Sequence, residues 1–461
     1  MNKKLLYLFL FIFAGCNESE KSSPNVFFSG EIVNPTSKHV VLYKGDVVID
    51  SSALDENKMF SFELDSIEDG LYHFNHAPEY QYVYLEKGDS LLIRLNTVDF
   101  DESLVFSGTG EEVNNFMMEI YLANEGEKNL IDELYSLDPE NFSRKIDSLE
   151  RLKIDLLNEL TLESALSDKA LQIARANIVY NYATFKERYP FRHKKLSKKK
   201  EVPKLSKAFY KYRKDLTYNN KDFTYLRPYY EYMVNHFGNL SYMSCSFGCD
   251  IKDKMVKNHL HFNKHKLKLI DSLVEEKELK DNLFRNVAVD YLLKVHDTEA
   301  NNKIFIEVFH ALSGNNKHIN EIDDLYVGIK NIQPNKRIPD VEVSNINGEK
   351  VSLQKIAKNK KTVFYFWSGA NKRHLENMSK RVLELSHKKP NYNFVGINVQ
   401  TNDDDWKVLT QTAGFNNANQ YRADNFEELT KALIVYPMNK CIITENEMIV
   451  DAFGDMYRSF K

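Results

Sequence analysis

Two thiols that lie close together in the sequence are the first side chains that could do chemistry. The chain of 461 residues contains four cysteines, and three residues separate Cys245 from Cys249. Such a pair could form a disulfide in an oxidising compartment, act as a redox pair or provide two metal ligands. The spacing differs from the Cys-x-x-Cys of redox motifs, so the favoured interpretation is a structural or incidental pair. Cys441 falls in an apolar segment and is interpreted as a small buried residue.

Three histidines downstream of this pair raise the question of a metal site. His259, His261 and His265 follow one another closely. His261 and His265 would share a helix face, a spacing that can bind zinc. No acidic or cysteine partner stands near them in the sequence, and Lys264 and Lys266 would repel a cation. We therefore predict no metal and no cofactor.

The N-terminus has the features of an exported protein. A basic start and an apolar run, too short to span a bilayer stably, predict a signal peptide over residues 1–15. The run ends in Ala14-Gly15-Cys16, which resembles the bacterial lipobox, in which small residues precede an acylated cysteine. Cys16 is therefore the expected lipid anchor, and residues 16–25 form a polar tether. The expected location is the cell envelope, on the periplasmic face or the outer membrane surface.

Composition excludes several classes of protein. Lys and Arg total 62 and Asp and Glu total 66, a net charge of −4, so bulk attraction to nucleic acid is not indicated. The chain contains 29 Phe and 26 Tyr but only 17 Gly, which favours folded, aromatic-rich cores over disorder. Four cysteines are too few for a disulfide scaffold, and the length allows two or three domains.

Three segments of the chain differ in the period of their apolar residues. Residues 26–110 alternate over short runs separated by turn residues, which predicts a small antiparallel β-sandwich or barrel. Residues 111–332 show apolar residues at intervals of three or four, which predicts an α-helical domain of six to nine helices. Residues 333–461 alternate strand-like and helical segments, which predicts a mixed sheet with helices on both faces. The clearest predicted helix face consists of Phe142, Ile146, Leu149, Leu152, Leu156 and Leu160.

Several motifs give the last segment a specific resemblance. Residues 362–367 form a continuous apolar run, as expected for a strand buried on both faces. Ile338-Pro339-Asp340 precedes this run, and Val435-Tyr436-Pro437 stands before the last predicted hairpin. With these motifs the segment resembles the membrane-anchored thioredoxin-like disulfide reductases and their peroxiredoxin-like relatives. Residues 26–110 likewise resemble the β domain that precedes thioredoxin domains in many envelope lipoproteins.

The resemblance implies a site that this sequence lacks. The family carries a Cys-x-x-Cys where the helix after the buried strand begins, and Asn371 and His374 fall at its two cysteine positions. In active relatives the helix N-terminus lowers the pKa of the first thiol, and the second thiol resolves the mixed disulfide. An amide and an imidazole can do neither, so we predict no catalytic residue. Asn371 is the expected N-cap, and the helix dipole should keep His374 neutral.

Two functional hypotheses from different classes remain, and a third is structural. The resemblance implies a cis-proline at Pro437 and a substrate groove that here includes Trp367, Tyr436 and Pro437. The first hypothesis is a redox-inactive, membrane-tethered protein that binds an envelope protein or peptide through this groove. The second is a thiol–disulfide oxidoreductase that uses Cys245 and Cys249, presented to the same groove. The third is a cell-surface scaffold, for which Pro437 would only shape a turn.

Overall fold

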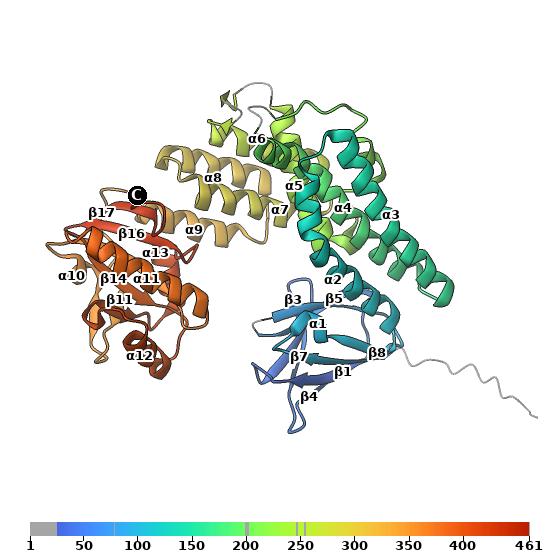
Figure 1. The fold of residues 1–461 in the computed structure, drawn as a ribbon, viewed down its shortest axis with the longest axis horizontal. Coiled ribbons are helices and arrows are strands. Elements are labelled where there is room, and N and C mark those ends of the chain that lie inside the picture. The colour runs from blue at the N-terminus through green and yellow to red at the C-terminus, as the bar shows by residue number, and fades with distance from the viewer. Residues whose placement is uncertain (1–24, 78, 199–201, 246–247, 253–254, 461) are drawn as a thin grey trace, which may run out of the picture. The chain divides into compact units, whose positions relative to one another are not determined.

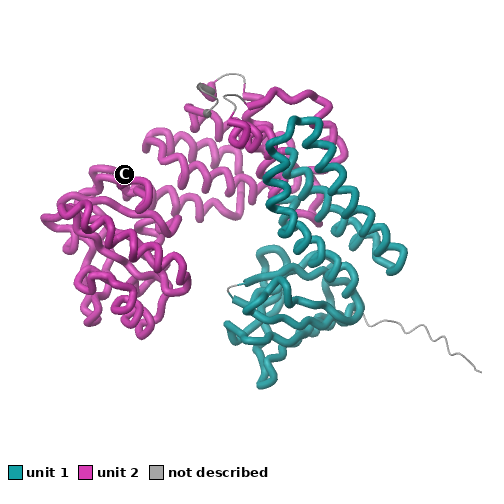
Figure 2. The backbone as a smooth tube through the Cα atoms, viewed as in Figure 1, with its two compact units in different colours: residues 1–186, 225–230 teal, residues 187–224, 231–461 magenta. Residues whose placement is uncertain are grey.

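The computed structural model describes residues 25–77, 79–198, 202–245, 248–252 and 255–460 (Figure 1). The predicted signal peptide, Cys16 and all but the last residue of the tether lie outside the described residues. The chain divides into two compact units, residues 1–186 with 225–230, and residues 187–224 with 231–461 (Figure 2). The predicted domain boundaries after residues 110 and 332 stay predictions. No helix in the described ranges is long and apolar enough to cross a membrane.

The N-terminal part contains two four-stranded sheets with the strand orders β4-β1-β7-β8 and β3-β2-β5-β6. Apolar side chains alternate along β1 and β4 and point into one core with those of the second sheet, as the period-two pattern predicted. The elements are β1 (Val26–Val33), β2 (His39–Lys44), β3 (Val47–Ala53), β4 (Met59–Leu64), β5 (Gly70–His76), β6 (Glu79–Leu85), β7 (Ser90–Asn96), α1 (Phe100–Ser103) and β8 (Val105–Thr109). The predicted β domain is therefore confirmed.

One strand pairing corrects the expectation of a wholly antiparallel domain. Strands β1 and β7 are parallel, with Phe27 opposite Ser90 and Val33 opposite Asn96. Parallel neighbours need a long crossover, here the intervening strands β2 to β6. The alternation of side chains is the same in parallel and antiparallel strands, so the sequence pattern could not distinguish the two.

The middle of the chain is helical, as predicted. Helix α3 begins where Asp138 accepts hydrogen bonds from two backbone N–H groups and Pro139 occupies the first turn. The described helices of this part are α2 (Glu111–Leu134), α3 (Pro139–Glu163), α4 (Asp168–Leu196), α5 (Arg227–Ser244), α6 (His259–Leu273), α7 (Lys277–Asp290), α8 (Glu299–Ser313) and α9 (Ile319–Asn331). A two-stranded hairpin, β9 (Ile251–Lys252) and β10 (Met255–Val256), interrupts them between α5 and α6.

The buried face of α3 agrees with the predicted one in the first half of the helix and differs from it in the second half. Leu152 and Leu156 are 58% and 38% exposed, whereas Lys153 and Leu157 are buried. The Lys153 ammonium group forms an ion pair of 2.9 Å with Glu127 of α2, which compensates its charge. A pattern built from apolar residues alone cannot include a buried lysine. The prediction therefore put the buried positions of the second half of α3 one residue too early in the sequence.

The C-terminal part is a seven-stranded mixed sheet with the order β12-β11-β15-β14-β13-β16-β17. Strand β13 lies parallel to β14 and antiparallel to β16, and every residue after its first is buried. Val363, Tyr365 and Trp367 pack in one core with side chains of α11 and α12, while Phe364 and Phe366 are equally buried on the other face. Both faces of the sheet are therefore covered, which confirms the predicted α/β architecture.

The elements of this part follow the predicted order closely. They are β11 (Glu342–Ser344), β12 (Lys350–Ser352), α10 (Leu353–Ala357), β13 (Lys361–Trp367), α11 (Lys372–Lys388), β14 (Asn393–Asn398), α12 (Asp403–Thr412), β15 (Gln420–Arg422), α13 (Phe426–Leu433), β16 (Lys440–Glu445) and β17 (Met448–Asp455). The short elements α10 and β15 were not predicted, because runs of three to five residues carry little periodic signal.

Candidate functional site

The loop that joins β13 to α11 contains the first of the two degenerate positions. Asn371 is the N-cap of α11, and its side-chain oxygen accepts a hydrogen bond of 2.9 Å from the backbone N–H of His374. The backbone N–H of Gly369 donates to the hydroxyl oxygen of Thr401 at 2.8 Å. The position of an attacking thiol is thus occupied by an amide that satisfies the helix terminus.

His374 lies in the first turn of α11, against the loop that follows Pro437. Both of its ring nitrogens are buried, and neither makes a hydrogen bond within the described part of the chain. Burial lowers the pKa of His374, and the nearby Asn439 side chain and Met438 backbone only partly oppose that shift. Burial thus favours the neutral imidazole beside the proline loop, and an imidazole in either protonation state cannot exchange a disulfide.

The proline loop connects α13 to β16 and is exposed. The Tyr436–Pro437 peptide bond is cis, and the Tyr436 side chain is 58% exposed. The loop is held at both ends, because the N–H of Tyr436 donates to the carbonyl of Ile434 at 2.8 Å and the N–H of Lys440 donates to the carbonyl of Pro437 at 2.9 Å. Among the described residues, no hydrogen bond to the Tyr436 carbonyl forms. The loop thus exposes an aromatic residue whose backbone carbonyl makes no hydrogen bond within the described chain.

Trp367 does not line an open groove, which corrects the prediction. Its side chain is fully buried, and the indole N–H donates to the side-chain oxygen of Gln420 at 3.0 Å. The ring of Phe415 lies 5.2 Å from the indole ring, centre to centre. Trp367 faces the core between the sheet and α11, because its place on β13 puts it on the same face as Tyr365. Of the three predicted groove residues, only Tyr436 and Pro437 are exposed.

The thiol nearest the proline loop in the sequence is chemically inert. Cys441 is fully buried in β16, and burial raises its pKa to about 12. The neighbouring Lys440 is also buried, and its ammonium group donates to the carbonyls of Leu433 and Ile434 at 2.7 and 2.8 Å. Burial lowers the pKa of Lys440 to about 7. Neither side chain presents a thiolate or a free base to the surface.

The thiol pair Cys245 and Cys249 belongs to the helical part of the chain. Cys245 and Cys249 are joined by a disulfide in the turn after α5, and Cys249 is buried. The disulfide therefore belongs to the helical part of the chain and not to the C-terminal sheet that carries the Pro437 loop.

The structure does bring a histidine to this disulfide, which the sequence analysis did not foresee. The sulfur atoms of Cys245 and Cys249 and a ring nitrogen of His261 lie within 4.8 Å of one another. The hairpin β9–β10 separates the cysteine pair from the histidines in the sequence. The order Cys-x3-Cys followed by His-x3-His was the available signal.

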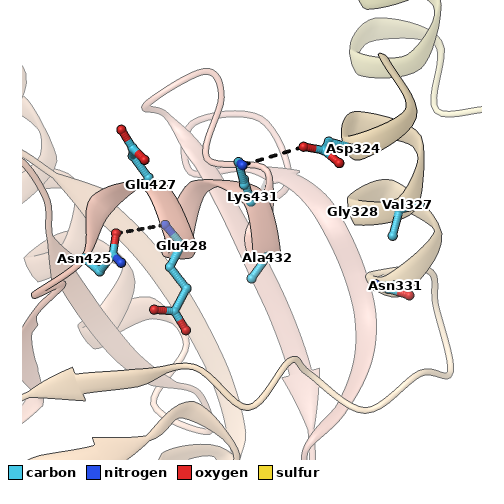
Figure 3. Close-up of a pocket in the computed structure, with 9 residues that line it drawn as sticks. All are labelled: Asp324, Val327, Gly328, Asn331, Asn425, Glu427, Glu428, Lys431 and Ala432. Atoms are coloured by element: carbon cyan, nitrogen blue, oxygen red, sulfur yellow. Dashed lines mark hydrogen bonds and ion pairs between the residues drawn. The ribbon is translucent and has the colours of Figure 1, made fainter. Parts of the chain in front are cut away.

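The largest of the hollows described here lies away from the proline loop. It has a volume of about 600 Å³ and is lined by residues of α9 and α13 (Figure 3). Lys431 and Asp324 pair across it at 3.6 Å, and Asn425 caps α13 by accepting from the N–H of Glu428. Because both members of this ion pair are largely exposed, it contributes at most about 1 kcal/mol. The hollow lies between two helices. Its lining residues include no nucleophile beside a base, so it is not a candidate active site.

Comparison with known proteins locates one family in the chain. Residues 334–459 match the model of the AhpC/TSA family. A thioredoxin domain of a thiol-disulfide oxidoreductase from Bacteroides vulgatus is 17% identical, with 26% of this chain and 86% of that chain covered and a TM-score of 0.23. A thioredoxin-like protein from Bacteroides caccae is 11% identical, covers 43% of this chain and 74% of its own, and has a TM-score of 0.31.

A secreted disulfide oxidoreductase from Mycobacterium tuberculosis is 10% identical, with 24% and 78% of the two chains covered and a TM-score of 0.21. No curated protein matches the chain. The matched residues span the whole seven-stranded sheet, from the segment before β11 to the end of β17. The C-terminal region of this chain, residues 334–459, is a thioredoxin-like domain of the AhpC/TSA family.

Proposed function

We propose that this chain is a lipid-anchored envelope protein whose thioredoxin-like domain has no redox activity and binds a protein or peptide partner. One observation carries the proposal. The exposed cis Tyr436–Pro437 loop lies beside Asn371 and His374, side chains that cannot exchange a disulfide. This combination supports a binding role for the loop, which contacts the substrate in active relatives, in the absence of disulfide exchange.

The loop offers the two features by which an extended peptide is recognised. The Tyr436 carbonyl can accept a hydrogen bond from a peptide N–H, as in strand addition to a sheet. The exposed Tyr436 ring adds a flat apolar surface of the kind that anchors many interfaces. Because no thiol lies at the two motif positions, such binding would be non-covalent and reversible.

Site-specific photo-crosslinking of the full chain tests the binding surface. A photoreactive residue replaces Tyr436 in one variant and Val450, a residue of β17 that is 53% exposed, in the control. We expect a discrete crosslinked species from position 436 alone. Equal crosslinking from both positions, or none from position 436 in the native envelope, would contradict the proposal.

The alternative function is thiol–disulfide exchange through Cys245 and Cys249, which form the bonded pair in the structure. An insulin-reduction assay on the full chain separates the two functions. We expect no turnover above background. Turnover that disappears in Cys245→Ser and persists in Cys441→Ala would favour the oxidoreductase and overturn redox inactivity.

A further inference from the structure

A disulfide, a hairpin and a helix follow one another between residues 245 and 273, apart from residues 246–247 and 253–254, which lie outside the described ranges. The turn containing Cys245 and Cys249 follows α5 directly, the hairpin β9–β10 comes next, and α6 begins at His259. The two sulfur atoms and a ring nitrogen of His261 lie within 4.8 Å of one another. Three side chains of the types that bind transition metals therefore converge on one point, outside the thioredoxin-like domain.

Backbone contacts hold the start of α6 against the turn. Asn258 caps α6 by accepting from the N–H of His261 at 2.9 Å, and its own N–H donates to the carbonyl of Cys249 at 3.1 Å. Gly248 has a φ of +89°, and a Cβ atom there would lie 2.5 Å from the His261 ring. A glycine is thus required where the ring approaches the turn. The convergence of the three side chains is therefore built into the local fold.

A fourth donor lies one helical turn further along α6. The Nε2 atom of His265 is 2.9 Å from the hydroxyl oxygen of Ser244, the residue next to Cys245. His261 and His265 share one face of α6 because four residues separate them. The order of the four donors is Cys-x3-Cys-x11-His-x3-His. The spacings within the cysteine pair and within the histidine pair fall in the range of structural zinc sites, and the interval of 11 residues between the pairs is one residue shorter than the usual range of about 12–15.

The chemistry of the four donors selects zinc. Two thiolates and two neutral imidazoles form a tetrahedral set that suits Zn²⁺ rather than Mg²⁺ or Ca²⁺, which prefer oxygen ligands. The two thiolate charges also balance the charge of the ion. Nearby lysines therefore carry little penalty, and the Lys266 ammonium group lies over the Phe262 ring, 5.0 Å from its centre.

We propose that these four side chains bind one Zn²⁺ when the cysteines are reduced, and that the disulfide and the zinc site are alternative states of the same turn. On binding, two Zn–S bonds form and the two thiols release two protons. A dithiol reductant converts the disulfide state, since two electrons and two protons pass to Cys245 and Cys249 while the dithiol becomes a disulfide. In the disulfide state the sulfur atoms are no longer thiolates, so the site is lost.

Metal titration of the full chain tests this proposal. The protein is reduced with a phosphine, stripped of metal with a chelator and titrated with Zn²⁺ and, separately, with Co²⁺. We expect one zinc per reduced chain and the charge-transfer absorption of thiolate-bound, tetrahedral Co²⁺. The oxidised wild-type chain serves as a folded control and should bind none. Absence of binding by the reduced wild-type chain would overturn the proposal.

Variants assign the ligands. Cys249→Ser should abolish binding, and His265→Gln should weaken it about tenfold or more, as loss of a metal-site partner commonly does. His259→Gln is the matched control, because His259 is exposed at the start of the same helix and, unlike His265, makes no hydrogen bond within the described chain to a residue next to the cysteines. Zinc binding that is unchanged in Cys249→Ser would refute the assignment. Circular dichroism of each variant verifies that α6 and its neighbours remain folded.

Discussion

At the scale of single residues, Asn371 and His374 have opposite effects on stability. Asn371 satisfies the N–H of His374 at the start of α11, which stabilises the helix. His374 buries both ring nitrogens, and this burial disfavours the charged imidazole. Of the two motif positions, Asn371 therefore stabilises the start of the helix, whereas His374 disfavours a charge there.

Replacing the cap should weaken the domain. We expect Asn371→Ala to lower the free energy of unfolding by about 1 kcal/mol, because an N–H at the helix start loses its acceptor. Urea denaturation followed by circular dichroism measures the change. Asn371→Asp is the control and should retain wild-type stability, since a carboxylate caps equally well and interacts favourably with the helix dipole. Equal stability of the Ala variant and the wild type would contradict the capping role.

His374 should make the stability depend on pH. Its pKa in the folded protein lies below the ordinary value of 6.5, so the unfolded chain takes up a proton first as the pH falls. The wild type should therefore lose stability as the pH drops below about 6.5. His374→Leu should lose less over the same range, as seen in urea midpoints at about pH 7.5 and about pH 5.5. Parallel pH profiles of the two proteins would exclude this contribution.

At the scale of elements, the junctions of β13 with α11 and of α13 with β16 bring a helix start and a cis-proline loop together. The helix start lies next to the exposed cis-proline loop, and the capping and backbone hydrogen bonds that hold both loops are intact. We therefore expect the backbone at positions 371 and 374 to tolerate two cysteines.

The double replacement Asn371→Cys with His374→Cys should create thiol–disulfide exchange. The N-terminus of α11 would lower the pKa of the first thiol, and the second would lie one turn away to resolve the mixed disulfide. Insulin reduction above the wild-type background is the expected result. The single replacement Asn371→Cys is the control, which should react with alkylating reagents but not turn over. A double variant that forms its disulfide yet shows no turnover would show that the Pro437 loop does not support the reaction.

Lys440 joins β16 to the end of α13 and should add a second pH dependence. Burial holds its pKa at about 7 in the folded protein against an ordinary 10.5, so the folded state releases this proton at lower pH than the unfolded chain. Stability should therefore rise as the pH increases from about 7 towards about 10.5. Lys440→Met should remove this rise in urea denaturation. Lys431→Met, which changes an exposed lysine of α13, is the matched control and should behave like the wild type.

At the scale of the whole molecule, the chain combines sheets, helices and a thioredoxin-like domain in two compact units. The proposed attachment to the envelope would depend on Cys16, which lies outside the described residues. Several acyl chains on one residue would hold the chain firmly at the bilayer surface.

Replacement of the anchor should release the protein. We expect Cys16→Ser to move the chain from the membrane fraction to the soluble fraction and to abolish labelling by a fatty-acid analogue. Cys441→Ala is the control, because that thiol is buried and takes no part in acylation. A Cys16→Ser chain that stays in the membrane fraction would rule out lipid anchoring at this residue.

The sequence by itself determined the elements of the thioredoxin-like domain, whereas the assignment of Asn371 and His374 to the two cysteine positions of the family stays a prediction. The apolar run of β13 and the turn before β17 are local signals, because side-chain period and turn chemistry depend on neighbours in the sequence. Only the tertiary structure decided that β1 pairs with β7 in parallel, that Trp367 faces the core and that His261 meets Cys245 and Cys249. Each of these depends on contacts between residues far apart in the chain, which no local period encodes.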